Sequence, residues 1–261
     1  AIDLFFLENH NDEVISLLNN LNADKLNRET KLVADIYRIA AICENAKPDS
    51  AMVLLQQLPH NLTRNNPELN FLYDCLQGLI LFRTNKFTES YATLFQIIDY
   101  KPIDIRAKAF NERITARICI ALGDYSKGID LLLKSSEDFE LAGLPKSIAI
   151  NHKIMGRNYM NVGNYSQALL SFQKAEEGLL ESKDSLELFY VYINYIDYYI
   201  KTNDLIKAQY YAKLCLKQIE NSKSNNMKTL VYNNMGEIEF KLKKYDNAIS
   251  YFNKTLNAPT D

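Results

Sequence analysis

A turn signature recurs along this chain at an almost fixed interval, and the recurrence constrains the fold more than any other feature. Small residues that follow the turn occupy positions 128, 168, 208 and 248, which are 40 residues apart. Upstream, Ser90, Ala51 and Val14 fill the same slot at intervals of 38, 39 and 37 residues. A period of this length indicates stacked supersecondary units, each of which contacts only its neighbours. We therefore expect an all-α solenoid of about seven helical hairpins rather than a globule with a single core.

The fifth unit shows how each hairpin is specified. Residues 147–162 place apolar side chains at nearly helical spacing. Gly163 can adopt the left-handed conformation that ends a helix, and Asn164 is a good N-cap for the next one. Asp124 and Asp204 occupy the same N-cap slot in neighbouring units. Each unit therefore reads as two antiparallel helices joined by a tight turn.

The whole chain divides into such pairs, with prolines at the expected breaks. The predicted pairs are 2–8 with 11–22, 28–45 with 48–58, 67–84 with 87–99, 103–122 with 125–141, 145–162 with 165–181, 184–202 with 205–221, and 225–242 with 245–257. We expect one array over residues 1–261, with units that end near 22, 58, 99, 141, 181, 221 and 257. Because the first helix is a stub and the last unit has no closing helix, we expect a fragment of a longer protein.

Charge and cysteine usage narrow the class of protein. The net charge of −2 argues against non-specific attraction to nucleic acid or to an anionic membrane. The four cysteines are scattered without a C-x-x-C pair, which predicts buried free thiols. No signal peptide or transmembrane stretch is evident. We expect a cytoplasmic protein that does not insert into membranes; the alternative is the periplasmic sensor region of a membrane-bound signalling protein.

Two of the units resemble the tetratricopeptide repeat family. The residues that carry the likeness are Met155, Gly156, Tyr159, Gly163, Tyr165, Ala168, Phe172 and Ala175, and then Met235, Gly236, Tyr245, Ala248 and Phe252. The likeness is strong from about 103 to 257 and weaker before that. The resemblance implies a right-handed superhelix in which the first helix of each pair lines an inner groove. The period of 38–40 exceeds the usual 34 of the family.

Two units depart from the family pattern, because Asn85 and Asn203 replace the turn glycine. Long-period arrays of this kind are similar to the sensory halves of bacterial regulators, which include peptide-pheromone receptors. The resemblance therefore implies a module that binds a peptide or protein segment.

The residues that catalysis or a metal would need are missing from the pattern. His10, His60 and His152 fall in different units, at spacings that suggest neither a metal site nor a catalytic triad. A glycine-rich phosphate loop and an H-E-x-x-H motif are also absent from the sequence. We expect a protein that is not an enzyme and that needs no cofactor or metal.

The inner groove is the best candidate for binding. Arg113 and Arg117 lie four residues apart on one first helix and share a face, and Lys153 and Arg157 occupy the same slots 40 residues on. Successive units should stack these four cations. The following units place further polar and aromatic groups in neighbouring rows, namely Tyr190, Asn194, Asp197, Asn233, Asn234 and Glu237.

These residue types suit an anionic or extended peptide. Asn offers a donor and an acceptor to a peptide backbone, and Arg can hold a carboxylate with two hydrogen bonds. The alternative is that groove positions are simply solvated and therefore polar. The Tyr-rich helix around residues 189–199 is apolar nearly all round, which favours core packing. A ligand shelf made by Tyr190 and Tyr195 is the alternative there.

Three function classes follow, in descending order of support. The first is a non-catalytic peptide- or protein-binding region of a signalling or transcription regulator, with the partner in the concave groove and no direct contact to nucleic acid. The second is a structural scaffold that joins proteins through its convex face or its ends, which leaves a homo-oligomer open. The third is an enzyme. The sequence identifies neither the ligand nor the output domain.

Overall fold

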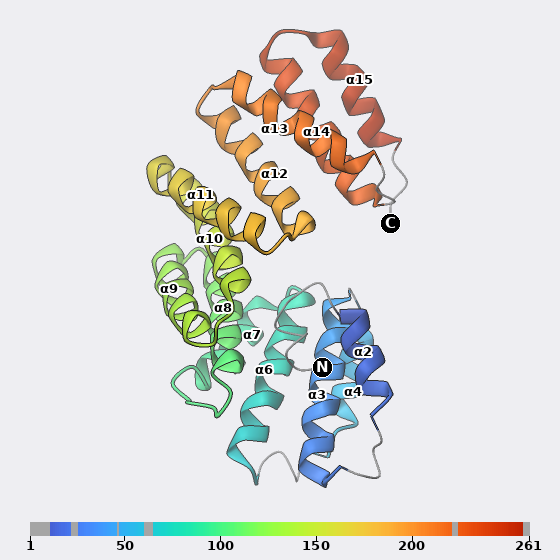
Figure 1. Cartoon of the computed structure of the whole chain (residues 1–261), viewed down its shortest axis with the longest axis vertical. Helices are drawn as coiled ribbons and strands as arrows, with labels where there is room; N and C mark the ends of the chain where they lie inside the picture. The colour runs from blue at the N-terminus through green and yellow to red at the C-terminus, as the bar shows by residue number, and fades with distance from the viewer. Residues whose placement is uncertain (1–10, 22–25, 46, 60–64, 221–223, 258–261) are drawn as a thin grey trace. The chain divides into compact units, whose positions relative to one another are not determined.

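The structure, a computed structural model, describes residues 11–21, 26–45, 47–59, 65–220 and 224–257. These residues form thirteen α-helices and no β-strand (Figure 1). The chain separates into two compact units, Ala1–Asn151 (unit 1) and His152–Asp261 (unit 2). The predicted helix 2–8 lies outside the described residues. Each other predicted helix has a counterpart whose ends differ by three residues or fewer.

Unit 1 is a series of antiparallel helix pairs. Its helices are α2 (Asn11–Asn19), α3 (Arg28–Glu44), α4 (Pro48–Gln56), α6 (Pro67–Arg83), α7 (Phe87–Gln96), α8 (Ile105–Ala121), α9 (Tyr125–Leu141) and the start of α10 (Pro145–Asn161). Helices α3, α6 and α8 each pack on the second helix of their own hairpin, which is α4, α7 and α9. Helix α6 also packs on both α3 and α8, so the first helices of successive hairpins are neighbours.

Unit 2 is also built from antiparallel helix pairs. It holds the rest of α10, and then α11 (Tyr165–Glu181), α12 (Ser185–Lys201), α13 (Leu205–Ile219), α14 (Asn225–Lys241) and α15 (Tyr245–Leu256). Helix α12 packs on α11, α13 and α14, and α14 packs on α15. First helices are again neighbours, as α12 and α14 show.

The turns form as the sequence predicts. Asn164 accepts a 3.2 Å hydrogen bond from the backbone N–H of Gln167, and Asp204 caps α13 in the same way. Gly163 has φ +77°, the left-handed region that favours glycine. Asn203 and Lys243 occupy the same turn position with φ of 62° and 61°. The turn geometry is therefore retained where its glycine is lost.

Close helix approach within the hairpins depends on glycine. A Cβ atom on Gly156 would lie 2.4 Å from Phe172, and one on Gly236 would lie 2.5 Å from Phe252. Any larger residue at these positions would displace the aromatic ring. The glycines named in the sequence pattern therefore set the distance between the two helices of a hairpin.

Polar contacts join neighbouring hairpins at a separation of about one repeat. Arg83 Nε donates a 3.1 Å hydrogen bond to Glu44, 39 residues earlier. Lys127 Nζ donates a 2.6 Å bond to the hydroxyl of Tyr91, 36 residues earlier. Lys153 of α10 forms an ion pair with Glu187, 34 residues later. Successive hairpins are thus held in register by specific pairs as well as by apolar packing.

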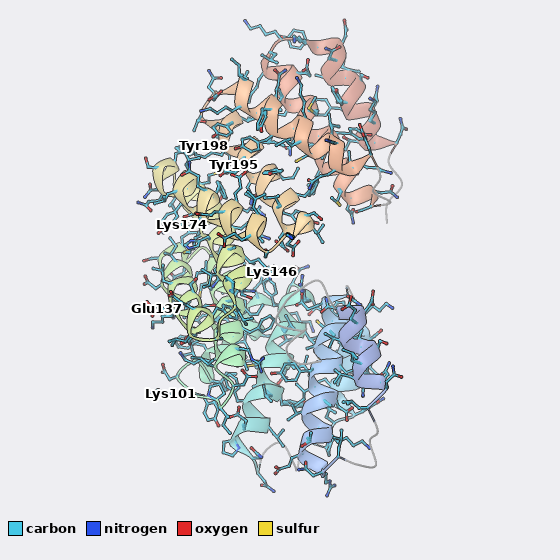
Figure 2. The ribbon with its side chains drawn as sticks, in the orientation of Figure 1. Lys101, Glu137, Lys146, Lys174, Tyr195 and Tyr198 are labelled. Carbon is cyan, nitrogen blue, oxygen red and sulfur yellow. The ribbon has the colours of Figure 1, made fainter. Side chains whose placement is uncertain are left out.

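Tyr195, Tyr198 and Tyr199 of α12 are buried, whereas Tyr190 and Tyr192 are half-buried; Figure 2 labels Tyr195 and Tyr198. Tyr195 is 1% exposed, stacks on Tyr211 at 4.5 Å between ring centroids, and donates a 3.0 Å hydrogen bond to Glu176. Phe172 meets the Tyr195 ring edge-on at 5.7 Å. Tyr195 is therefore a core residue and offers no surface for a ligand shelf.

Candidate functional site

Arg113 is a buried connection between helices and not a groove residue. Its side chain is 3% exposed, and its Nε donates a 2.6 Å hydrogen bond to Asn151. A second guanidinium nitrogen donates to the carbonyl of Ser147 at 2.8 Å, and the group lies 4.5 Å from the ring centre of Phe139. Because α10 of the next hairpin covers it, Arg113 leaves little surface for the ligand contact that the sequence analysis predicts. We leave Arg113 out of the proposed ligand surface.

Arg117, one turn further along α8, is half-buried. Its guanidinium carbon lies 4.6 Å from the ring centre of Phe82 on α6. This is a cation–π contact between neighbouring first helices of unit 1. Part of the side chain remains accessible, so a ligand contact by Arg117 stays a prediction.

Lys153 carries a charge that another residue of the chain already balances. Its ammonium group pairs with Glu187, and the two side chains are only 16% and 13% exposed. The ammonium also lies 5.6 Å from the ring centre of Tyr190. Burial, and then the nearby Glu187 carboxylate, raise the pKa of the Tyr190 hydroxyl. Lys153 is thus less available to an anionic ligand than its position in the repeat suggested.

The remaining candidates differ in accessibility. Arg157 and Asn233 are exposed, whereas Tyr190, Asp197, Asn234 and Glu237 are half-buried and Asn194 is buried. Asp197 pairs with Lys201 at 3.4 Å on its own helix. Arg113 and Arg117 belong to unit 1, and the other candidates belong to unit 2. That the four cations form one row stays a prediction.

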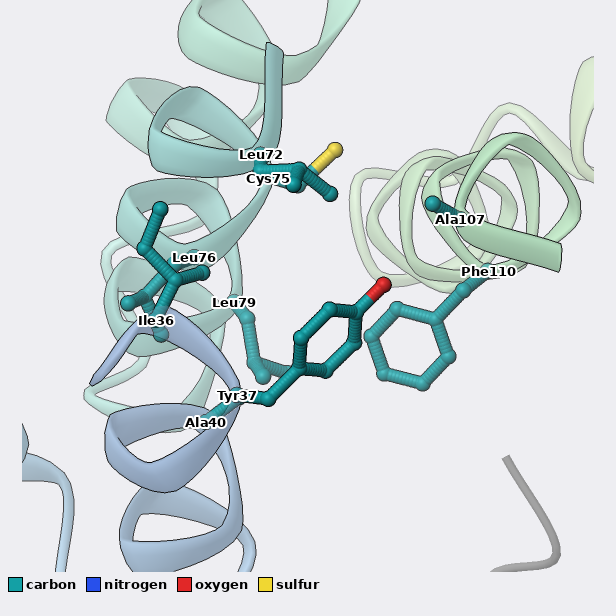
Figure 3. A pocket seen from close by; sticks show the side chains of 9 residues that line it. All are labelled: Ile36, Tyr37, Ala40, Leu72, Cys75, Leu76, Leu79, Ala107 and Phe110. Atoms are coloured by element: carbon teal, nitrogen blue, oxygen red, sulfur yellow. The ribbon is translucent and has the colours of Figure 1, made fainter. Parts of the chain in front are cut away.

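An apolar pocket between α3, α6 and α8 of unit 1 was missed by the sequence reasoning. Figure 3 shows the side chains that line it, which come from three successive first helices. The lining residues are Ile36, Tyr37, Ala40, Leu72, Cys75, Leu76, Leu79, Ala107 and Phe110. Their side chains offer only two polar groups, the hydroxyl of Tyr37 and the thiol of Cys75. In Figure 3 the Cys75 sulfur points toward the side on which Ala107 lies.

Three carboxylates, Asp104, Glu68 and Asp74, act on the two polar side chains of the pocket. Burial is the largest cause of the raised pKa values of Tyr37 and Cys75, but nearby negative charges contribute to both. Asp104 and Glu68 raise the pKa of Tyr37 and the guanidinium of Arg106 lowers it, whereas Asp74 and Glu68 raise the pKa of Cys75.

The carboxylates differ in their partners. Asp104 is balanced by Arg106 two residues later, with a shortest N···O distance of 2.8 Å. Glu68 instead accepts hydrogen bonds from the backbone N–H of Ile103 at 3.0 Å and from the hydroxyl of Tyr100 at 3.3 Å. Within the described part of the chain, Glu68 forms no ion pair.

One sequence signal could have revealed the pocket. On α6, Leu72, Cys75 and Leu79 form a stripe at helical spacing, and such a stripe reads as ordinary core. Glu68 continues the stripe one turn toward the N-terminus. A carboxylate in line with apolar residues indicates that this face reaches solvent.

No group of three or more His, Cys, Asp or Glu side chains that could hold a metal ion occurs among the described residues. His152 is half-buried, and His10 and His60 lie outside the described residues. The four cysteines are free thiols, of which only Cys75 is not fully buried. Among the described helices, none combines the length and apolar character needed to cross a membrane.

Helical hairpins with this turn, this glycine contact and this repeat length define a helical-repeat protein. Residues 230–258 match the family model of the tetratricopeptide repeat. A tetratricopeptide repeat is thus identified at residues 230–258, which supports the resemblance, and the all-α solenoid class is confirmed for the described part of the chain. No curated protein matches the chain by sequence.

Solved structures share the fold at low sequence identity. The Cut9–Hcn1 hetero-tetramer of APC/C matches at 16% identity and a TM-score of 0.69, over 94% of this chain and 43% of that one. A signal-transduction ATPase with a tetratricopeptide repeat sensor, from Pyrococcus horikoshii, matches at 16% identity and a TM-score of 0.67, over 95% of this chain and 40% of that one. NprR in complex with its cognate peptide NprX matches at 16% identity and a TM-score of 0.64, over 90% of this chain and 68% of that one.

The chain spans less than half the length of the first two of these structures.

Proposed function

We propose that this chain is a non-catalytic module that binds a peptide or protein segment, as the sensing or partner-binding region of a signalling or transcription regulator. The proposal rests on the charged, solvent-accessible side chains that occupy one equivalent position in three successive repeats. Arg157 on α10, Asp197 on α12 and Glu237 on α14 are 40 residues apart, and each reaches solvent. Identical positions on successive first helices face the same side of a repeat array.

The charges of this slot change sign along unit 2, from one cation to two carboxylates. Asn233 and Asn234 add donors and acceptors that can pair with a peptide backbone. A surface of this kind suits an extended segment of mixed charge. The similar fold of NprR, which was solved with its cognate peptide, supports the same class of ligand.

The test uses a randomised twelve-residue peptide display library selected on the whole chain. Selected peptides are measured by fluorescence anisotropy against the charge reversals Arg157→Glu, Asp197→Lys and Glu237→Lys. Each reversal should weaken binding by about tenfold, the effect of losing one charge-assisted contact. Lys174→Glu on α11 and Lys213→Glu on α13 reverse exposed charges on second helices and should leave binding unchanged. Equal binding by every variant would remove the proposal.

An assembly scaffold is the second candidate, and α15 gives it a specific observation. Ile249 and Leu256 are 57% and 80% exposed. Their counterparts in earlier hairpins, Leu169 and Leu216, are half-buried. An apolar face of this kind can be covered by another protein or a second copy. Light scattering over a hundredfold concentration range distinguishes the two: a monomer throughout, unchanged by Ile249→Lys, would count against assembly through α15.

A further inference from the structure

We propose that the pocket between α3, α6 and α8 receives one apolar side chain of a bound peptide, and that Glu68 holds a Lys or Arg next to it in that peptide. The inference rests on the proposed function and adds a sequence preference to it. It concerns unit 1, whereas the accessible charged slot described above lies in unit 2.

The lining of the pocket requires an apolar occupant. Nine side chains from three helices form it, and its two polar groups, the Tyr37 hydroxyl and the Cys75 thiol, are uncharged at neutral pH. A charged or strongly polar side chain placed there would lose its hydration and gain at most the hydroxyl of Tyr37 and the thiol of Cys75 as partners. An apolar side chain would instead lose only unfavourable contact with water.

The position of Glu68 defines what lies beside that apolar side chain. Glu68 precedes Leu72 by one helical turn on the stripe that continues through Cys75 and Leu79. Its carboxylate accepts hydrogen bonds from neutral donors and forms no ion pair among the described residues. A cation adjacent to the pocket would therefore meet an unbalanced carboxylate.

The other charges around the pocket reinforce this preference. Asp74 accepts a 2.9 Å hydrogen bond from Asn70, and burial raises its pKa. Arg106, whose charge also acts on Tyr37, pairs with Asp104. The balance of these charges is negative, which favours a basic neighbour for the apolar anchor and disfavours an acidic one.

The experiment selects the same twelve-residue display library on the whole chain and then measures the selected peptides against pocket variants. Cys75→Phe fills the pocket, and Cys75→Ser leaves its size nearly unchanged as the matched control. Enriched peptides should carry Leu, Phe, Tyr or Trp beside Lys or Arg. They should bind Cys75→Phe at least tenfold more weakly than Cys75→Ser, as expected for the loss of one buried apolar side chain.

A second pair of variants tests the charge. Glu68→Gln keeps an oxygen acceptor for Ile103 and Tyr100 but removes the charge, and should weaken binding about threefold, with less effect at high salt. Glu89→Gln on α7 changes an exposed carboxylate away from the pocket and should have no effect. Peptides whose binding is the same for Glu68→Gln and Glu89→Gln would remove the role of Glu68.

A readout on the unsubstituted protein covers the case in which Cys75→Phe does not fold. Cys75 is the one cysteine that is not fully buried, so methyl methanethiosulfonate should modify it before the others. Selected peptides should slow that modification at least fivefold, measured by peptide mass spectrometry. Unchanged modification at saturating peptide would overturn the proposal.

The remaining outcomes separate this inference from the proposed function. Peptides that lose affinity for Arg157→Glu but not for Cys75→Phe would leave the proposed function standing and sink the pocket assignment. If removal of residues 1–10 alone accelerates Cys75 modification to a rate that peptide no longer changes, the occupant is the chain's own first segment, and the proposal fails. If peptide affinity is unchanged by both Arg157→Glu and Cys75→Phe, the proposed function and the pocket assignment are both wrong.

Discussion

The guanidinium Nε of Arg113 lies 2.6 Å from the side-chain oxygen of Asn151, so a charged donor and a neutral acceptor meet inside unit 1. The amide of Asn151 in turn donates 3.0 Å bonds to the hydroxyls of Ser135 and Ser136. This network ties α8, α9 and α10 together. A residue that sequence reasoning assigned to ligand binding is therefore a determinant of hairpin packing.

Replacing Arg113 with Met should destabilise the protein by about 2–4 kcal/mol, because the change leaves Asn151 and the Ser147 carbonyl without their buried donor. Urea denaturation followed by circular dichroism measures the loss. Arg157→Met, an equal change at an exposed position of α10, should stay within about 0.5 kcal/mol of the parent. Equal stabilities for the two variants would contradict the structural role of Arg113.

Gly156→Ala should cost about 1–3 kcal/mol, since the new methyl group would lie 2.4 Å from the Phe172 ring. The double variant Gly156→Ala with Phe172→Leu should be destabilised by less than the sum of the two single changes, because the smaller side chain makes room. Thermal melts of the four proteins form a double-mutant cycle. Additive losses would show that the two positions do not meet.

Lys243→Gly should stabilise the chain by about 0.5 kcal/mol, because Lys243 adopts φ +61° and a glycine is not strained there. The gain is reduced by the greater freedom of glycine in the unfolded chain. Gly163→Ala, at φ +77°, should instead lose about 1 kcal/mol. A melting temperature lowered by Lys243→Gly would argue that this turn has a different conformation in solution.

His152 should make stability depend on pH below neutrality. Burial, and then the charge of Lys174, lower its pKa to about 4, so the unfolded chain binds the proton more readily than the folded one. The contribution of His152 is present above its unfolded pKa and is lost as pH falls toward 4. Between pH 7 and pH 5 the loss should be about 1 kcal/mol, after allowance for its partial exposure.

The His152→Gln variant isolates this effect from the carboxylates, which titrate in both proteins. The difference in unfolding free energy between parent and variant should narrow or change sign as pH falls from 7 to 5. A difference that is constant over this range would mean that His152 takes up its proton equally in the folded and unfolded chains.

The helix boundaries could be predicted closely because residues next to each boundary determine where the helix ends. Asn164 and Asp204 cap the helices that follow them, and Gly163 ends the one before, so a few adjacent residues determine each boundary. The spacing of 40 residues then relates equivalent positions in successive units. These signals need no knowledge of which faces later meet.

The sites were less accessible to prediction because burial depends on the next hairpin. The spacing of Arg113 and Arg117 shows that they share a face, but not that α10 covers one and leaves the other half-exposed. The pocket was missed for a related reason, since Tyr37 and Cys75 look like core residues until α8 is placed beside α3 and α6. Partner choice between helices is a tertiary property.

The polar pairs between neighbouring hairpins limit how such an array can evolve. Arg83 donates to Glu44 of the preceding hairpin, and Lys127 donates to Tyr91 of the preceding hairpin. If two hairpins exchanged places, these donors would no longer lie beside their acceptors. A duplicated or shuffled hairpin would bring its own half of a pair against an unsuitable partner. The array therefore has a fixed order, and new length can be added most readily at a terminus, where only one such match has to be satisfied.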